Sequence, residues 1–324
     1  MKIDDICTEM EDIYETVLDY RTEGEGSCDH KVSIKDCLLG LQMALNHIPN
    51  LKFDEFDVED LLWMEQPQNG DLNWIVPRKL LALAGPTAHN WPITKFISYA
   101  KDHSIGSMVR LNRAHYPAEE ITKAGMEHIE MFMHDGTNPT PQNVREFIDL
   151  VERMSSKNLA VAVHCRAGLG RTGTMIAAYL LFQFARDAKT DKNHPKDCPC
   201  TELQAEEVAR AIIGYLRIMR PGSVLSGQPE FLESIADIVM KAGAANDSSI
   251  INSFEAIDDS SVNIEIDSLT NVEEDKISFQ VRYSKRLRMS SKSCDNLKIM
   301  KHPVSHAGRG HAAEKHSTVQ IEKI

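Results

Sequence analysis

The middle of the chain alternates short apolar runs with longer amphipathic patterns. Runs typical of buried strands fall at residues 74–76, 80–84, 108–111, 128–133 and 159–163. Helical spacing of apolar residues occupies approximately 91–103, 141–155, 172–186, 202–219 and 229–242. Strands interleaved with helices in this way predict an α/β fold, with a central, mainly parallel sheet flanked by helices on both faces.

The regions on either side of this α/β pattern differ from it. Amphipathic helices are predicted within 1–20 and from Ile34 to Leu45, and after Gly243 the apolar pattern dissolves. Acids without Lys or Arg fill 247–275, and bases predominate in 276–315. We therefore expect a short helical amino-terminal part at 1–66, an α/β catalytic domain at 67–243, and a disordered tail at 244–324 that is first acidic and then basic.

Composition narrows the class of protein. The 324 residues are 42% hydrophobic and 26% charged, and no apolar run approaches the roughly 20 residues that a membrane helix needs. A net charge of -12 argues against general nucleic-acid binding. A basic cluster in the tail suits an anionic partner, nuclear import or plain solvation; it consists of Arg282, Lys285, Arg286, Arg288 and Lys292. The start lacks a secretory-signal pattern, so we expect a location in the cytoplasm, the nucleus or both, with free thiols among the seven cysteines.

The most informative stretch is LAVAVHCRAGLGRTGTMIAAYLLF at 159–182, which is typical of a buried strand, a tight turn and an apolar helix. Cys165 precedes Arg171 by six residues, and glycines in the turn leave its backbone free to curl. Curling directs successive N–H groups inward, towards the positive end of a helix that begins near Thr172. We predict a phosphate-binding loop, with cysteine at its floor, formed by Arg166, Ala167, Gly168, Leu169, Gly170 and Arg171.

The same loop predicts a reactive thiol. A helix amino terminus beside a cation lowers the pKa of cysteine from about 8.5 to about 3.5–7.5, so Cys165 is a candidate nucleophile. The planar guanidinium of Arg171 suits two phosphoryl oxygens. Thr172 can donate its hydroxyl to the sulfur or serve only as a helix cap, and His164 is interpreted as a residue that orients the loop.

Two further residues complete a candidate hydrolytic site. Departure of a serine or threonine oxygen requires a proton, and Asp135, in a turn after a predicted strand, is the candidate general acid. Gln228, just before the last helix of the domain, is the candidate for orienting the water that hydrolyses a phosphocysteine intermediate. No cofactor or metal is required by this chemistry.

Six runs together resemble the cell-division-cycle-fourteen family of dual-specificity protein phosphatases, the mitotic-exit phosphatases. They are NGDLNWIVP at 69–77, GP at 85–86, VRLN at 109–112, HDGTNPT at 134–140, HCRAGLGRTGT at 164–174 and RPGSVLSGQ at 220–228. The resemblance covers about 65–235 and implies a cysteine-phosphatase fold, with only the closing portion of the family's amino-terminal domain present. It implies the roles given above for Cys165, Arg171, Asp135 and Gln228.

The resemblance also implies a substrate class. It implies hydrolysis of phosphotyrosine and of phosphoserine or phosphothreonine followed by proline, in proteins phosphorylated by mitotic kinases. Glu65 and Asp71 match acids of the family's groove for basic residues, whereas Leu62 replaces a third. Alternatives from the sequence are a catalytically idle phosphopeptide scaffold or a phosphoinositide phosphatase, which Leu169 disfavours. The insert at 187–200, with Cys198, Cys200 and His194, is predicted to be an exposed loop rather than a metal site.

Overall fold

The computed structural model describes residues 32–49, 51–52, 54–192, 195, 198–225, 227–253, 301–302 and 318–319. The helix predicted within 1–20, the basic cluster of the tail and His194 lie outside these ranges. The chain divides into two units, of which the first ends at Asp259 and contains the sheet described next. No helix within the described ranges is both long and apolar enough to cross a bilayer.

A five-stranded sheet forms the centre of the first unit, in the order β1-β2-β5-β3-β4. The strands are β1 (Leu72–Val76), β2 (Leu80–Leu83), β3 (Ile105–Arg110), β4 (Glu127–Glu130) and β5 (Ala160–His164). Only β1 runs antiparallel to its neighbour, so the mainly parallel sheet is confirmed. Because β5 lies between β2 and β3, the segment that follows it is at the middle of the sheet edge.

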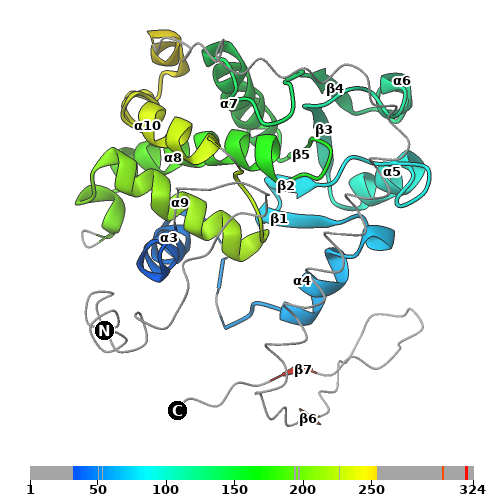
Figure 1. The fold of residues 1–324 in the computed structure, drawn as a ribbon, viewed down its shortest axis with the longest axis horizontal. Coiled ribbons are helices and arrows are strands. Elements are labelled where there is room, and N and C mark those ends of the chain that lie inside the picture. Colours follow the sequence, from blue (N-terminus) through cyan, green and yellow to red (C-terminus); the bar gives the residue numbers. More distant parts are fainter. Residues whose placement is uncertain are drawn as a thin grey trace. The chain divides into compact units, whose positions relative to one another are not determined.

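Helices cover both faces of this sheet (Figure 1). The α-helices are α3 (Ile34–His47), α4 (Val58–Met64), α5 (Ile93–Asp102), α6 (Ala118–Lys123), α7 (Pro141–Ser155), α8 (Gly170–Thr190), α9 (Ala205–Met219) and α10 (Gln228–Ala245). Short 3-10 turns are η1 (Pro67–Asn69), η2 (Pro199–Thr201) and η3 (Ser248–Ser253).

Alternate strand residues enter two separate cores. Val161 and Val163 of β5 face a large core shared with α3 and with helices α7 to α10. Ala160 and Ala162 of the same strand face a smaller core shared with α5 and α6. Since successive strand side chains point to opposite faces, the near-continuous apolar runs of the sequence are explained by burial on both sides.

Helix α8 is the central support of the large core. Its residues from Arg171 to Ala185 are all buried, and it packs against α7, α9 and α10. Helix α3 packs chiefly against α9 and also touches α8. It therefore lies in the same compact unit as the sheet, although the sequence separates 1–66 as an amino-terminal part.

Several sequence predictions need correction. The predicted tail starts too early, because α10 continues to Ala245, ends at Asn246 in a left-handed cap (φ 53°) and is followed by η3. Lys301–His302 and Thr318–Val319, inside that tail, form a two-stranded ladder within the second unit. Short helices α4 and α6 escaped prediction because each offers too few turns for a helical period to be recognised.

The prediction of an exposed loop at 187–200 is also wrong for part of that insert. Helix α8 extends through its first residues to Thr190, and Cys198 and Cys200 are buried at 0% and 8% exposure. Both sulfurs lie beside the imidazole of His47, at the end of α3. A polar composition predicted solvation, whereas the two thiols behave as small apolar groups and turn inward.

Candidate active site

Cys165 follows directly on the central strand β5 and precedes the loop that leads into α8. It is 3% exposed. The helix begins at Gly170, two residues earlier than the sequence indicates, so Arg171 belongs to its first turn. The thiol thus lies at the carboxyl end of a parallel sheet and at the amino end of a 21-residue helix, where the helix dipole favours negative charge.

Two carbonyl groups of the loop accept hydrogen bonds from one buried arginine. Arg220, fully buried, donates from Nη2 to the carbonyl of Ala167 (3.0 Å) and from Nε to that of Gly168 (2.6 Å). The remaining donors of its guanidinium reach Asn73 Oδ1 (2.6 Å) and Asp71 Oδ1 (3.1 Å). A single planar fork therefore ties two loop peptides to the segment that begins β1.

The carbonyl groups at the two ends of the loop also accept hydrogen bonds from other segments. The carbonyl of Arg166 accepts from the N–H of Gly85 (3.0 Å), and that of Leu169 accepts from the N–H of Val224 (3.3 Å). Across the described ranges, the N–H groups of 167–169 donate to no protein acceptor. Loop carbonyls that accept from other segments and amides without a protein acceptor are the arrangement in which backbone N–H groups can bind a phosphate.

Two glycines are required by close approach of backbone around this loop. Gly168 has φ +65°, and a Cβ there would lie 2.0 Å from the carbonyl oxygen of Leu83. A Cβ on Gly85 would lie 2.7 Å from the carbonyl oxygen of Cys165. Since real Cβ contacts are not that short, both positions exclude any side chain. This explains why the GP run at 85–86 accompanies the cysteine loop in the sequence.

The electrostatic surroundings of Cys165 favour its thiolate. Burial by itself raises the pKa of Cys165, but the charge of Arg171 and the hydroxyl and N–H of Thr172 outweigh burial, and the net pKa lies below its ordinary value. The carboxylate of Asp135 opposes this by a small amount. The Thr172 hydroxyl has no well-aligned partner within the described part of the chain, yet it is close enough to the sulfur to stabilise negative charge.

Arg171 and Asp135 form an ion pair in this structure. Arg171 donates from Nη2 to Asp135 Oδ1 (2.9 Å) and from Nη1 to the carbonyl of Met133 (2.8 Å). Its Nε, although buried, has no acceptor among the described residues. The Asp135 side chain is 76% exposed, on the loop between β4 and α7. The predicted general acid and phosphate ligand are thus neighbours, and the loop that carries the acid is open to solvent.

Gln228 lies between the cysteine loop and the Asp135 loop. It is 1% exposed at the start of α10, and its Oε1 accepts from the N–H of Leu225 (3.0 Å). Its Nε2 donates to the carbonyl of Thr137 (3.2 Å). A Cβ on Gly170 would lie 3.0 Å from Gln228 Oε1, so the amide faces the first turn of α8. Gln228 therefore lies beside the residue that precedes Arg171 and bonds to the loop that carries Asp135.

His164 supports the loop from below and is not placed to exchange protons with a substrate. Its Nδ1 donates to the carbonyl of Cys165 (2.9 Å), because that carbonyl can only accept, and its Nε2 accepts from the hydroxyl of Tyr116 (2.6 Å). Complete burial lowers the pKa of His164 to about 3, so the ring is neutral. This agrees with the role of orienting the loop.

The sequence analysis did not identify Tyr116 or the residues that position it. Its hydroxyl also lies near Met108 Sδ (3.4 Å), and its carbonyl accepts from Nη1 of Arg110 (2.6 Å). Arg110 in turn forms a two-pronged ion pair with Glu130 on the neighbouring strand. The run VRLN at 109–112 contains that arginine, but a single Tyr in a turn carries no signal of its own.

The two acids predicted to bind a basic substrate residue have different surroundings. Asp71 accepts from Arg220 and is one support of the cysteine loop. Glu65 follows α4 as its carboxy-terminal cap residue and is half-buried. No pattern in the sequence distinguishes the surroundings of Asp71 from those of Glu65.

Comparison with known proteins agrees with the geometry. Residues 84–185 match a family model described as a polymorphic toxin system, DSP-PTPase phosphatase. Human dual specificity protein phosphatase CDC14A is 37% identical over 224 residues, which cover 67% of this chain and 34% of CDC14A. The CDC14 homolog of Schizosaccharomyces pombe, a tyrosine-protein phosphatase, is 35% identical over 66% of this chain and 38% of that protein.

The matched region spans 34% and 38% of the length of these two relatives, so the chain corresponds to less than half of each. Among solved structures, PTPMT1 is 22% identical, with a TM-score of 0.40, over 54% of this chain and 99% of that one.

Proposed function

We propose that this chain, a homologue of the CDC14 dual-specificity phosphatases, hydrolyses phosphate monoesters of proteins through a phosphocysteine intermediate. The observation that carries the proposal is the loop at 166–169: its carbonyls accept from other segments, and the N–H groups of 167–169, which have no acceptor among the described residues, remain for a ligand above the Cys165 sulfur. The unpartnered Nε of Arg171 adds a cationic donor at the same place. These groups suit a tetrahedral dianion.

In the first step the Cys165 thiolate attacks phosphorus and the bond from phosphorus to the substrate oxygen breaks. Asp135 gives its proton to the departing oxygen, which otherwise leaves as a basic alkoxide. Arg171 and the loop amides hold the equatorial oxygens as charge redistributes. Binding of a phosphate at Arg171 displaces the Asp135 carboxylate from the ion pair seen here, and the displaced, solvent-exposed carboxylate takes up a proton from solvent before it acts as the acid.

In the second step water attacks phosphorus and the bond from sulfur to phosphorus breaks, returning the thiolate. Asp135, now ionised, accepts the proton of that water. Gln228, held between two backbone groups at the mouth of the loop, orients the water. The Thr172 hydroxyl stabilises the departing thiolate, which is why its position beside the sulfur matters.

The names of the curated relatives support a dual-specificity phosphatase, and the finer substrate class is our proposal. We propose phosphotyrosine together with phosphoserine or phosphothreonine followed by proline, at sites of mitotic kinases. Glu65 is the candidate for contact with a basic residue of the substrate. For Asp71, whose carboxylate accepts from Arg220, we propose support of the loop as its main role. Because Asp71 mainly supports the loop, we expect a weaker preference for basic substrate residues than a site in which both acids contact the substrate would show.

The test is hydrolysis of p-nitrophenyl phosphate and of matched phosphopeptides by the full chain. We expect turnover with wild-type protein, none with Cys165→Ser, and faster hydrolysis of a phosphoserine-proline peptide than of its phosphoserine-alanine counterpart. Cys37→Ser, which removes a partly buried thiol elsewhere, is the matched control and should retain activity.

Two results would redirect the proposal. Folded wild-type protein that binds phosphopeptides but never releases phosphate supports a scaffold. Faster release from phosphoinositide vesicles than from any peptide supports a lipid phosphatase, a result we do not expect because position 169 of the loop is a leucine and not a cation.

A further inference from the structure

A second cluster of reactive side chains lies apart from the cysteine loop, where α3 meets the insert after α8. It contains His47, Cys198 and Cys200, whose ligand-type atoms all lie within 4.8 Å of one another. His47 Nε2 is 3.2 Å from Cys200 Sγ and 3.5 Å from Cys198 Sγ, and the two sulfurs are 2.9 Å apart. All three side chains are at least nine-tenths buried.

We propose that His47, Cys198 and Cys200 bind a zinc ion that fastens α3 to the insert. Thiolate sulfur and imidazole nitrogen are the ligands that Zn²⁺ prefers in proteins, and two cysteines in a Cys-Pro-Cys turn are already on the same side of the chain. The ring of His47 is held for this role by stacking on Phe184 of α8, with ring centroids 4.4 Å apart.

The distances suit tetrahedral coordination after a small adjustment. Zn–S bonds of about 2.3 Å and Zn–N bonds of about 2.0–2.1 Å place ligand atoms roughly 3.6–3.8 Å apart. Both His-to-Cys distances are within about 0.4 Å of that range, and the sulfurs need to separate by about 0.9 Å. The sulfurs are also too far apart for a disulfide bond of about 2.05 Å, so both thiols are available.

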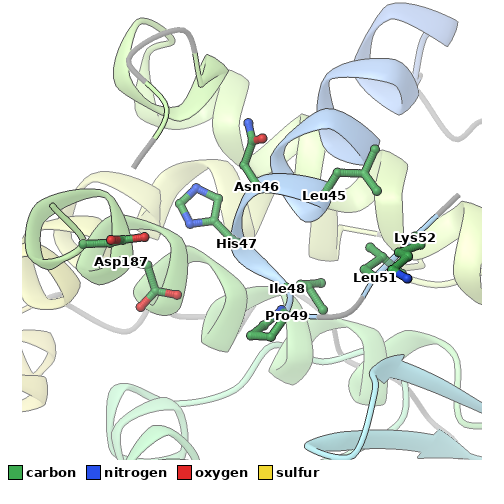
Figure 2. A pocket seen from close by; sticks show the side chains of 9 residues that line it. Leu45, Asn46, His47, Ile48, Pro49, Leu51, Lys52 and Asp187 are labelled. Atoms are coloured by element: carbon green, nitrogen blue, oxygen red, sulfur yellow. The ribbon is translucent and has the colours of Figure 1, made fainter. Parts of the chain in front are cut away.

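The fourth ligand has a source beside the cluster. His47 lines a pocket of about 540 Å³, together with Asp187 and Asp191. Figure 2 shows His47 and Asp187 among the residues of its wall. This volume admits several water molecules, so a water can complete the coordination of the ion. The cluster joins residues 153 positions apart in sequence. A bound ion would therefore hold α3 against the segment that follows α8, within the unit that carries the active site.

The test uses the full chain with Cys165→Ser, which prevents the catalytic thiol from binding metal. Protein loaded with Zn²⁺ under reducing conditions and desalted should retain one equivalent. Replacement of zinc by Co²⁺ should give thiolate-to-cobalt charge-transfer absorption and the visible bands of a tetrahedral site. X-ray absorption at the zinc edge should show two sulfur ligands and at least one nitrogen ligand, a readout that needs no variant at the cluster.

Variants then assign the site. In the same background Cys198→Ser and Cys200→Ser should each weaken zinc binding by on the order of a hundredfold, whereas Cys37→Ser should leave it unchanged. Chelation should increase amide hydrogen exchange across Ile34–His47. The proposal is overturned by protein that retains no metal, by a Cys198–Cys200 disulfide under reducing conditions, or by an absorption edge without sulfur ligands.

Discussion

The hydrogen bonds from Arg220 to the cysteine loop give the sharpest structural prediction, tested by Arg220→Lys. Lysine keeps a positive charge near Asp71, but its single ammonium cannot span the carbonyls of Ala167 and Gly168 while also reaching Asn73. A hydrogen bond from a charged donor contributes about 1.5–3 kcal/mol. Because lysine breaks the hydrogen bond to one loop carbonyl and weakens the other, we expect the loop to be destabilised by about 2–3 kcal/mol.

This destabilisation should appear in catalysis, because the same peptides carry the phosphate-binding amides. At about 1.4 kcal/mol per tenfold change, kcat/KM for p-nitrophenyl phosphate should fall by about 30–150-fold, and vanadate should inhibit more weakly. Denaturation in urea should separate this effect from unfolding. Arg210→Lys, at a partly exposed arginine that pairs with Glu233 (3.3 Å), is the matched control and should retain activity. Folded Arg220→Lys protein with wild-type kcat/KM and vanadate affinity would refute the reasoning.

Three further predictions concern the reacting groups and their support. Because Arg171 lowers the pKa of Cys165, Arg171→Met should move the alkylation of that thiol by iodoacetamide to higher pH, and an unchanged pH profile would contradict the assignment. Asp135→Asn should slow hydrolysis of phosphoserine peptides by about 10²–10⁴-fold. Hydrolysis of p-nitrophenyl phosphate should slow much less, since its activated leaving group needs no acid. Equal losses with the two substrates would show that Asp135 is not the general acid. Tyr116→Phe should cost about 1–3 kcal/mol of stability in urea, because His164 Nε2 loses its buried donor, with little change in kcat; unaltered stability would show that this hydrogen bond is dispensable.

Local patterns in the sequence were enough to predict the frame of the fold and the centre of the site. Strands β1, β2, β3 and β5 and the longer helices match apolar patterns of the sequence, because each buries one face or both, whereas β4 is only partly buried and covers just the first part of its predicted run. Cys165, Arg171 and Thr172 lie within one short run, so their convergence follows from a single strand, loop and helix start. Asp135 was predictable from its place after a strand.

The groups that shape the loop from outside were not predictable in this way. Arg220 reaches Ala167 and Gly168 from more than fifty positions away, and a buried arginine has no local pattern that distinguishes it from a solvated one. The support of Asp71 for Arg220 was hidden for the same reason. The cluster of His47 with Cys198 and Cys200 depends on the packing of α3, which no spacing within the insert reveals.

The central claim is that the Cys165 sulfur accepts the phosphoryl group. Rapid quenching of the Gln228→Ala variant during turnover, in which hydrolysis of the intermediate is slowed, followed by mass spectrometry of its peptides, measures this directly. The account predicts one phosphoryl group on the peptide that contains Cys165 and none in the matching Cys165→Ser protein. A phosphoryl group on any other residue, or steady turnover in the Cys165→Ser protein, would contradict it.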